Sequence, residues 1–241
     1  TTLDYENACL VGRTIEEEVI EVEGVKMPLE ELFEVNRAKF ATVYPDTCKN
    51  EAEVMSSTPE ERTDCYPGEA VEHPIAYLPV FPGTNCDYDT AKAFRRAGAE
   101  VRMSVLCNLE EDDILRSIDE MCAHIREAHI FALSGGFSAG DEPDGSAKLI
   151  VSVLNNEKVK AEIHALLDRG GLILGICNGF QALVKSGLLP YGRLGMVTTE
   201  SPTLFRNDIN RHISQIVTTR VSTTRSPWLS GFKLGEEHAI A

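Results

Sequence analysis

The sequence predicts an α/β fold in which an open, mostly parallel sheet carries helices on both faces. Beyond about residue 73, apolar segments of strand length alternate with amphipathic segments of helix length, and this alternation is typical of βαβ units. Residues 171–176, GLILGI, are continuously apolar, as strands buried on both faces of a parallel sheet are. Of the 241 residues 43% are hydrophobic, which is enough for a buried core.

Residues 1–45 predict a small unit of two strands and a helix. The runs CLVGRT and EEVIEVEG have β-like composition, and Pro28 opens the helix-like stretch that follows them. A unit of this size is too small to bury a core alone. Residues 46–72 are polar and acidic, contain turn formers and show no period, so they predict a linker. The second domain is therefore expected to extend over residues 73–241.

The elements of the second domain follow in a regular order. Its strands are expected at PIAYLPV, AEVRMSVL, HIFALSGG and GLILGI, and its helices at DYDTAKAFRRAG, ILRSIDEMCAHI, SAKLIVSVLNN and VKAEIHALLDRG. After Pro190 the chain becomes β-rich and polar, and the last residues, AIA, resemble the start of a strand. Active sites in such sheets lie at the carboxyl ends of the strands. The loops FPGTNCD, SGGFSAGDEPDG and CNG are thus the candidates for function.

The charge and the cysteines exclude several classes of function. A formal net charge of -15 disfavours nucleic acids and anionic membranes as partners, because both are bound through basic patches. The N-terminus lacks the pattern of a signal peptide, and no apolar run reaches the roughly 20 residues of a membrane span. We therefore expect a cytoplasmic protein. The seven cysteines are scattered, without a CxxC pair or a histidine at ligand spacing, so neither disulfides nor a metal site are expected.

Cys177 stands between the GLILGI strand and a helix, with Gly175 two residues before it and Gly179 two residues after it. This is the nucleophile-elbow pattern with cysteine in place of serine: a sharp turn exposes the nucleophile, and the glycines let strand and helix approach closely. The amides at the N-terminus of the helix favour the thiolate form. The pattern leaves a second interpretation open, in which Cys177 is a small buried residue in a tight turn.

Gly135 and Gly136 follow a strand that should end at the same edge of the sheet as Cys177. Their backbone amides, together with the amide of Asn178, could form an oxyanion hole for a reaction at the sulfur. On spacing alone, an ordinary loop turn is an equally good interpretation of the two glycines.

The motifs GICNGFQ, SGGFSAGDEPDG and PVFPGTNCD together resemble the class I, triad-type glutamine amidotransferases over about residues 73–241. The wording GGFSAGD, with PGTNCDYD, LFRNDINRHIS and SPWLSG, is most similar to the purine-biosynthetic branch, the glutaminase domains of phosphoribosylformylglycinamidine synthases. Residues 1–45 resemble the tail of the ATP-dependent synthetase region that precedes the glutaminase in the long, single-chain form of these enzymes. The resemblance implies a flavodoxin-like fold and the release of ammonia from glutamine for the amination of formylglycinamide ribonucleotide.

The resemblance also implies roles for individual residues. Cys177 would attack the side-chain amide of glutamine and form a γ-glutamyl thioester that water hydrolyses, while the amides of Gly136 and Asn178 hold the oxyanion. The implied substrate pocket includes Gln181, Phe137 and Gly135. No cofactor is implied for this domain, whereas ATP and magnesium belong to the synthetase region, which would be a partner on the same polypeptide. Without the resemblance, another interpretation stays open for each: Gln181 as a helix-surface amide and Phe137 as a packing residue.

Cys86, in PGTNCD, also lies at a strand end on the expected active edge. No GxCxG elbow surrounds it, so a direct chemical role is disfavoured. We expect Cys86 to shape a tight turn, with Asn85 or Asp87 capping the next helix.

The family supplies the base of the cysteine as a histidine two residues before a glutamate, just after a late strand. No such pair occurs in these 241 residues, and EEHAIA resembles the strand that leads to it. We therefore expect the chain to stop short of the pair and to be nearly inactive alone. His238 is a poor substitute, because it precedes the expected strand and its neighbours Glu236 and Glu237 come before it; His212 is no better.

Two other functions remain open. A flavodoxin-like cysteine hydrolase of the peptidase or deglycase type would carry the same elbow, but it predicts a histidine shortly after the cysteine or a glutamate early in the domain, and neither is evident. A non-catalytic docking module would retain Cys177 as a vestige. Labelling with a glutamine-analogue electrophile separates these possibilities, since only a glutaminase should be modified at Cys177 in preference to the other thiols.

Overall fold

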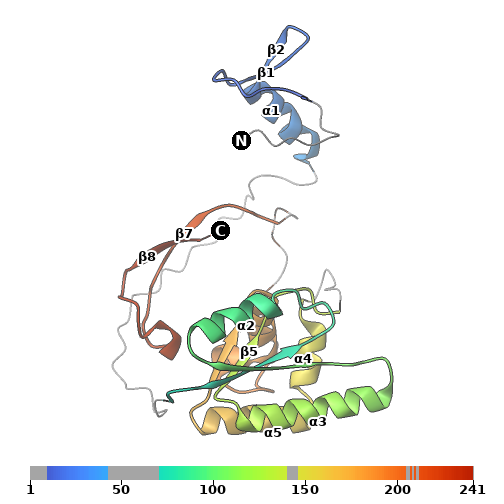
Figure 1. Cartoon of the computed structure of the whole chain (residues 1–241), viewed down its shortest axis with the longest axis vertical. Coiled ribbons are helices and arrows are strands. Elements are labelled where there is room, and N and C mark those ends of the chain that lie inside the picture. The colour runs from blue at the N-terminus through green and yellow to red at the C-terminus, as the bar shows by residue number, and fades with distance from the viewer. Residues whose placement is uncertain are drawn as a thin grey trace. The chain divides into compact units, whose positions relative to one another are not determined.

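The computed structural model describes residues 10–42, 71–139, 146–204, 207, 209 and 212–240. These fall into two compact units, one formed by residues 10–42, 207, 209 and 212–214 and the other by residues 71–139, 146–204 and 215–240 (Figure 1). Most of the predicted linker, the end of the SGGFSAGDEPDG loop and part of LFRNDINRHIS lie outside the described residues.

The first unit is a hairpin followed by a helix: β1 (Val19–Val22), β2 (Val25–Pro28) and α1 (Leu29–Phe40). Glu23 and Gly24 join the strands, both with positive φ, which is the backbone geometry that two-residue hairpin loops favour. Pro28 precedes the first helical residue, so the predicted helix start is confirmed. The strand predicted at CLVGRT is wrong: residues 10–14 form none, because the strand that pairs with β1 is β2, on its other side in the sequence.

The second unit is built on four parallel strands, β3 (Ile75–Val80), β4 (Glu100–Val105), β5 (Ile130–Leu133) and β6 (Leu172–Gly175). Their order in the sheet is β4-β3-β5-β6. Counted from β3, this is the 2-1-3-4 order of flavodoxin-like doubly wound sheets. The predicted fold class is therefore confirmed. The order reverses between β3 and β5, and the loops that follow these two strands meet there.

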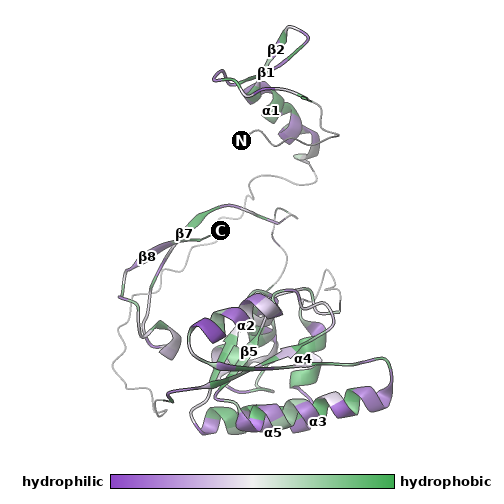
Figure 2. Ribbon diagram, in the orientation of Figure 1, coloured by the Kyte–Doolittle hydropathy of each residue, from purple (hydrophilic) through white to green (hydrophobic). Residues whose placement is uncertain are grey.

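Helices cover both faces of this sheet (Figure 1). Alternate residues of β3 point to opposite sides: Ala76 and Leu78 pack with Phe94 in one cluster, and Tyr77 packs with Ile125 in the other. The strands are mostly apolar, whereas the helices present polar residues outward (Figure 2). The helices are α2 (Asp87–Arg96), α3 (Glu111–Glu127), α4 (Lys148–Leu154), α5 (Glu157–Asp168), α6 (Asn178–Ser186) and α7 (Leu188–Tyr191). None of the described helices is both long and apolar enough to pass through a membrane.

Strand β6 differs from its prediction. Its apolar run predicts a strand buried on both faces, but all four of its residues are half-buried, and β6 is the last strand on its side of the described sheet. Trp228, in the short helix η1 (Pro227–Leu229), covers its outer edge: the indole Nε1 donates a 2.9 Å hydrogen bond to the carbonyl of Ile173. The same ring meets Phe94 edge-on at 6.4 Å. An apolar run alone cannot distinguish a central strand from an edge covered by a side chain.

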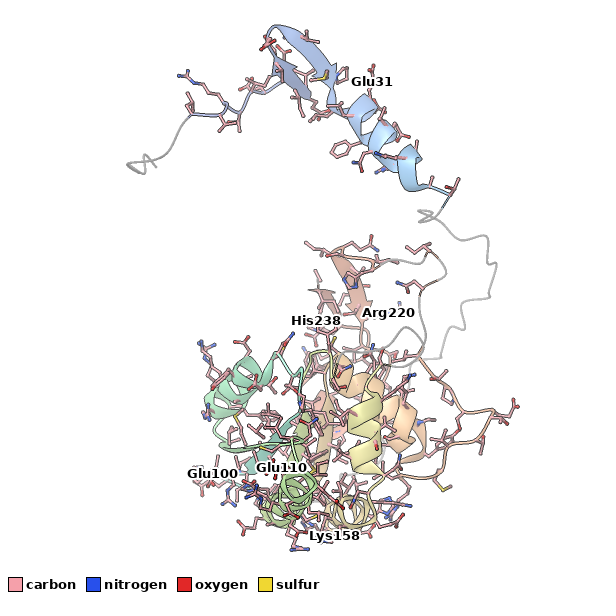
Figure 3. The ribbon with its side chains drawn as sticks, turned by 90° about the vertical axis from the view of Figure 1, so that its right-hand side faces the viewer. Glu31, Glu100, Glu110, Lys158, Arg220 and His238 are labelled. Carbon is pink, nitrogen blue, oxygen red and sulfur yellow. The ribbon has the colours of Figure 1, made fainter. Side chains whose placement is uncertain are left out.

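A hairpin of β7 (Val217–Arg220) and β8 (Glu237–Ile240) completes the described fold. The strand expected near AIA is confirmed as β8, whereas residues 195–200, GMVTTE, form no strand although the chain after Pro190 is expected to be β-rich. His238 lies within β8, opposite Thr219, and not before the strand as predicted. Figure 3 shows His238 and Arg220 on the two strands of this hairpin.

Candidate active site

Cys177 connects β6 to α6 in a strained backbone conformation. Its φ is 51° and its ψ is −107°, in a region that non-glycine residues rarely adopt. It precedes the first residue of α6, its carbonyl accepts a hydrogen bond from the amide of Gln181, and the residue is exposed. The elbow that the GxCxG pattern predicts is thus present, and the alternative of a buried thiol in a tight turn is wrong.

The two glycines of the elbow permit contacts that a side chain would block. A Cβ on Gly179 would lie 2.2 Å from the carbonyl oxygen of Leu133 in β5. A Cβ on Gly175 would lie 2.7 Å from the carbonyl oxygen of Gly179 and equally close to Leu183. Real Cβ atoms do not approach backbone this closely, so a substitution at either position would push α6 away from the sheet and move Cys177.

The loops after β3 and β5 are joined where the strand order reverses. Thr84 and Gly136 form an isolated antiparallel bridge, and the amide of Phe137 donates a 2.8 Å hydrogen bond to the carbonyl of Gly83. Gly136 has a φ of 146°, and a Cβ there would lie 2.5 Å from the Gly83 oxygen. In doubly wound sheets ligands bind at this switch point, beyond the carboxyl ends of the strands.

Gly135 brings both loops against the elbow. A Cβ built on this buried glycine would lie 3.4 Å from Cβ of Cys177 and 3.4 Å from Sγ of Cys86. The Gly135 carbonyl accepts the amide of Asn85 at 3.1 Å. Gly135, Cys86 and Cys177, which follow three different strands, therefore lie close together.

Cys86 shapes the turn before α2, as predicted, but the predicted capping is wrong. Cys86 itself is the residue that precedes the helix, and no side chain caps the helix by a hydrogen bond there. Instead the Cys86 carbonyl accepts a 2.6 Å hydrogen bond from Oγ1 of Thr90. Neither Asn85 nor Asp87 takes the capping position, because α2 begins at Asp87. Capping by Asn85 would require the helix to begin one residue earlier, and capping by Asp87 would require it to begin one residue later.

Asn178 and Gln181 are linked through their side chains. Asn178 is only 2% exposed; its Oδ1 accepts the amide of Ser138 at 3.3 Å, and its Nδ2 donates to Oε1 of Gln181 at 3.1 Å. The sequence pattern drew attention only to the backbone amide of Asn178. One feature of the sequence could have indicated a role for its side chain: a polar residue stands in the first turn of a helix whose other inward positions are mostly apolar, and a buried polar group needs hydrogen-bond partners.

Phe137 is 64% exposed and lies directly after Gly135 and Gly136. Because its ring is not packed into either core cluster, its interpretation as a packing residue is not supported. Gly135, Gly136, Asn178 and Gln181 are also found at this edge, so the structure brings the predicted site residues together around Cys177.

Three histidines have structural positions. His124 stacks on Tyr77 with ring centroids 4.9 Å apart, and Nδ1 of His129 accepts the amide of Ile75 at 3.0 Å. Nε2 of His164 accepts the amide of Leu194 at 3.0 Å, and burial lowers the pKa of this imidazole.

No histidine within the described ranges is hydrogen-bonded to Cys177. His238 lies 3.4 Å from Oε1 of Glu236 and meets Phe232 edge-on, both in its own hairpin region. His212 is exposed. Among the described residues, Cys177 therefore has no histidine hydrogen-bonded to it.

Comparisons with known proteins show the family of this chain. A family described as the CobB/CobQ-like glutamine amidotransferase domain matches residues 73–241. The phosphoribosylformylglycinamidine synthase subunit PurQ of Roseobacter denitrificans is 33% identical over 165 residues, which are 68% of this chain and 61% of that protein. The subunit of the same name from Dehalococcoides mccartyi is 40% identical over 112 residues, which are 45% of this chain and 38% of that protein. The chain thus spans less than two thirds of the length of these relatives.

Among solved structures, PurLQS from Thermotoga maritima is similar, with 29% sequence identity and a TM-score of 0.49 over 70% of this chain and 65% of that chain. The family match, over residues 73–241, includes the elbow, the four parallel strands and most of the sequence. The chain therefore belongs to the family of CobB/CobQ-like glutamine amidotransferase domains.

Proposed function

We propose that the second unit hydrolyses glutamine with Cys177 as the nucleophile and supplies ammonia for the ATP-dependent conversion of formylglycinamide ribonucleotide to formylglycinamidine ribonucleotide. The observation that carries this proposal is the elbow: an exposed cysteine with positive φ at the start of α6, facing the Gly135 loop. Family membership supports the glutaminase reaction. The names of the relatives support the destination of the ammonia.

The reaction begins when the Cys177 thiolate attacks the side-chain carbonyl carbon of glutamine. The N-terminus of α6 stabilises the negative charge on sulfur before the attack. The amides of Gly136 and Asn178 then receive the developing oxyanion. The bridge to Thr84 uses the residues that flank Gly136, and among the described residues no acceptor takes the N–H of Gly136 itself. Ammonia leaves with a proton, and water hydrolyses the γ-glutamyl thioester to glutamate.

The proton transfers need a base, and we place it in a histidine–glutamate pair of a longer polypeptide. The support is twofold: the family uses such a pair, and no described histidine bonds to Cys177. Residues 1–241 alone are then expected to turn over glutamine orders of magnitude more slowly than the full-length protein. Equal turnover by the two forms would exclude this part of the proposal.

The first unit is proposed to be the end of a synthetase region on the same polypeptide, as in the long, single-chain form. Its support is the resemblance of residues 1–45 to that region. ATP and magnesium would bind in the rest of that region and not in the glutaminase unit. Ammonia would then pass between the two sites inside one protein.

Covalent labelling tests the nucleophile directly. 6-Diazo-5-oxo-L-norleucine, an electrophilic analogue of glutamine, should modify Cys177 in preference to the other six cysteines, and glutamine should slow the reaction. Peptide mass spectrometry locates the adduct. The Cys177→Ser variant should remain unlabelled, while Cys86→Ser, which removes the neighbouring exposed thiol, should still be labelled. Unselective labelling of the exposed cysteines would favour a non-catalytic module.

A further inference from the structure

The buried amide of Asn178 joins the loop after β5 to the substrate face of α6. Its Oδ1 accepts a hydrogen bond from the Ser138 amide, which joins the helix to the loop, and its Nδ2 donates a hydrogen bond to Gln181 within the same helix. Ser138 is itself buried, in the loop that also carries the two site glycines. A polar side chain that is 2% exposed must be satisfied by such partners, so this arrangement is rigid.

The orientation of the Asn178 side-chain amide follows from the backbone donor of Ser138, and the orientation of the Gln181 side-chain amide follows from that of Asn178. The backbone N–H of Ser138 can only donate, so the atom of Asn178 that faces it must be the carbonyl oxygen. The other end of the Asn178 amide is then its NH₂ group, which can only donate. Gln181 must therefore present its oxygen to Asn178. A backbone donor in one loop thus fixes the orientation of a side-chain amide on the helix.

The consequence is that the NH₂ group of Gln181 points away from Asn178. Gln181 is one helical turn after Cys177 and shares its helix face, as the hydrogen bond from its amide to the Cys177 carbonyl shows. The residue is half-buried, and among the described residues its side chain is hydrogen-bonded through Oε1, to Asn178, and not through its NH₂ group. This donor is available to a ligand bound beside the sulfur.

We propose that Asn178 is a positioning residue: it holds the Gln181 amide so that its NH₂ group donates to an oxygen of the substrate. The site thereby selects a ligand with a hydrogen-bond acceptor at this point and rejects one that presents a donor. This inference rests on the proposed function, because it takes the ligand of Cys177 to be glutamine. It adds a residue whose side chain acts through Gln181 and does not itself touch the substrate.

The Asn178→Asp variant tests whether Asn178 orients the Gln181 amide, because it leaves the shape of the side chain at position 178 nearly unchanged. Aspartate still accepts the Ser138 amide, but its second oxygen cannot donate to Gln181. Gln181 must then turn its NH₂ group toward the aspartate and its oxygen toward the ligand. Kinetics of labelling by 6-diazo-5-oxo-L-norleucine in the full-length protein should show the half-saturating concentration rise about tenfold or more, the effect of losing one good hydrogen bond.

Three comparisons separate the effect of Asn178 on the orientation of Gln181 from other effects of the substitution. Gln181→Met should raise the same concentration to a similar extent, and adding Asn178→Asp to it should cause no further rise. Alkylation by iodoacetamide, which needs no glutamine recognition, reports any change in sulfur reactivity, and thermal melting reports folding. An equal effect of Asn178→Asp with and without Gln181 would overturn the inference, as would wild-type behaviour of Asn178→Asp. A wild-type protein without saturable labelling would instead refute the glutaminase proposal itself.

Discussion

Gly179 of α6 lies so close to Leu133 of β5 that a single added carbon would sit 2.2 Å from the Leu133 carbonyl oxygen. This contact sets how near α6, the helix that follows Cys177, comes to the centre of the sheet. The position of Cys177, two residues earlier, depends on it.

Gly179→Ala should therefore displace α6 and misplace Cys177. We expect labelling of Cys177 by 6-diazo-5-oxo-L-norleucine to slow about a hundredfold, because nucleophilic attack is sensitive to displacements near 1 Å. The free energy of unfolding should fall by about 1–3 kcal/mol, as for other overpacked sites. Gly231→Ala is the matched control, since nothing lies within 4 Å of its added carbon. Normal labelling of Gly179→Ala would show that the close approach is not needed.

Trp228→Phe should remove the hydrogen bond to Ile173 and keep most of the ring contact with Phe94. The expected loss is about 1 kcal/mol in the free energy of unfolding, measured by urea denaturation. Trp228→Ala should cost clearly more, because it also uncovers the edge of β6. Equal losses in the two variants would mean that the ring contributes nothing beyond its indole N–H.

Tyr77 should make the fold sensitive to alkali. Its hydroxyl shares a 2.6 Å hydrogen bond with Ser104, and burial raises its pKa above the usual value. The unfolded chain releases this proton first, at a pH of about 10, so the free energy of unfolding should decrease as the pH rises further. Tyr77→Phe should flatten this decrease in denaturation curves. Tyr88→Phe, at a position 79% exposed, should leave it unchanged.

His164 should make the fold sensitive to acid. Burial lowers the pKa of its imidazole, and protonation would also break the hydrogen bond from the Leu194 amide. Its contribution to stability is thus present above the usual pKa of about 6.5 and is lost as the pH falls below that value. His164→Gln should weaken this acid dependence of the unfolding midpoint. His73→Gln, at an exposed position, provides the control, and an unchanged profile in His164→Gln would contradict the assignment.

Much of the second unit could be predicted from hydrophobic periodicity. The four parallel strands and the helices between them occur close to where the alternation places them, because each must bury one face or one stripe in a sheet of this kind. The apolar run of β6 was the exception. Whether such a run lies at the centre or at the edge depends on which segments pair with it, and that is not a local property. The predicted capping of α2 by Asn85 or Asp87 was wrong for a similar reason. The start of α2 depends on the hydrogen bonds that the amides of Asn85 and Cys86 donate to the Gly135 carbonyl, in a loop distant in sequence.

The sequence by itself determined the elbow of Cys177, because the requirement for glycine at Gly175 and Gly179 is steric and local to one strand–helix turn. Only the tertiary structure decided the surroundings of that elbow. Ser138 and Asn178 are 40 residues apart in the chain, and no spacing rule relates them. Their hydrogen bond exists because the parallel strands β5 and β6 end side by side at the same edge of the sheet.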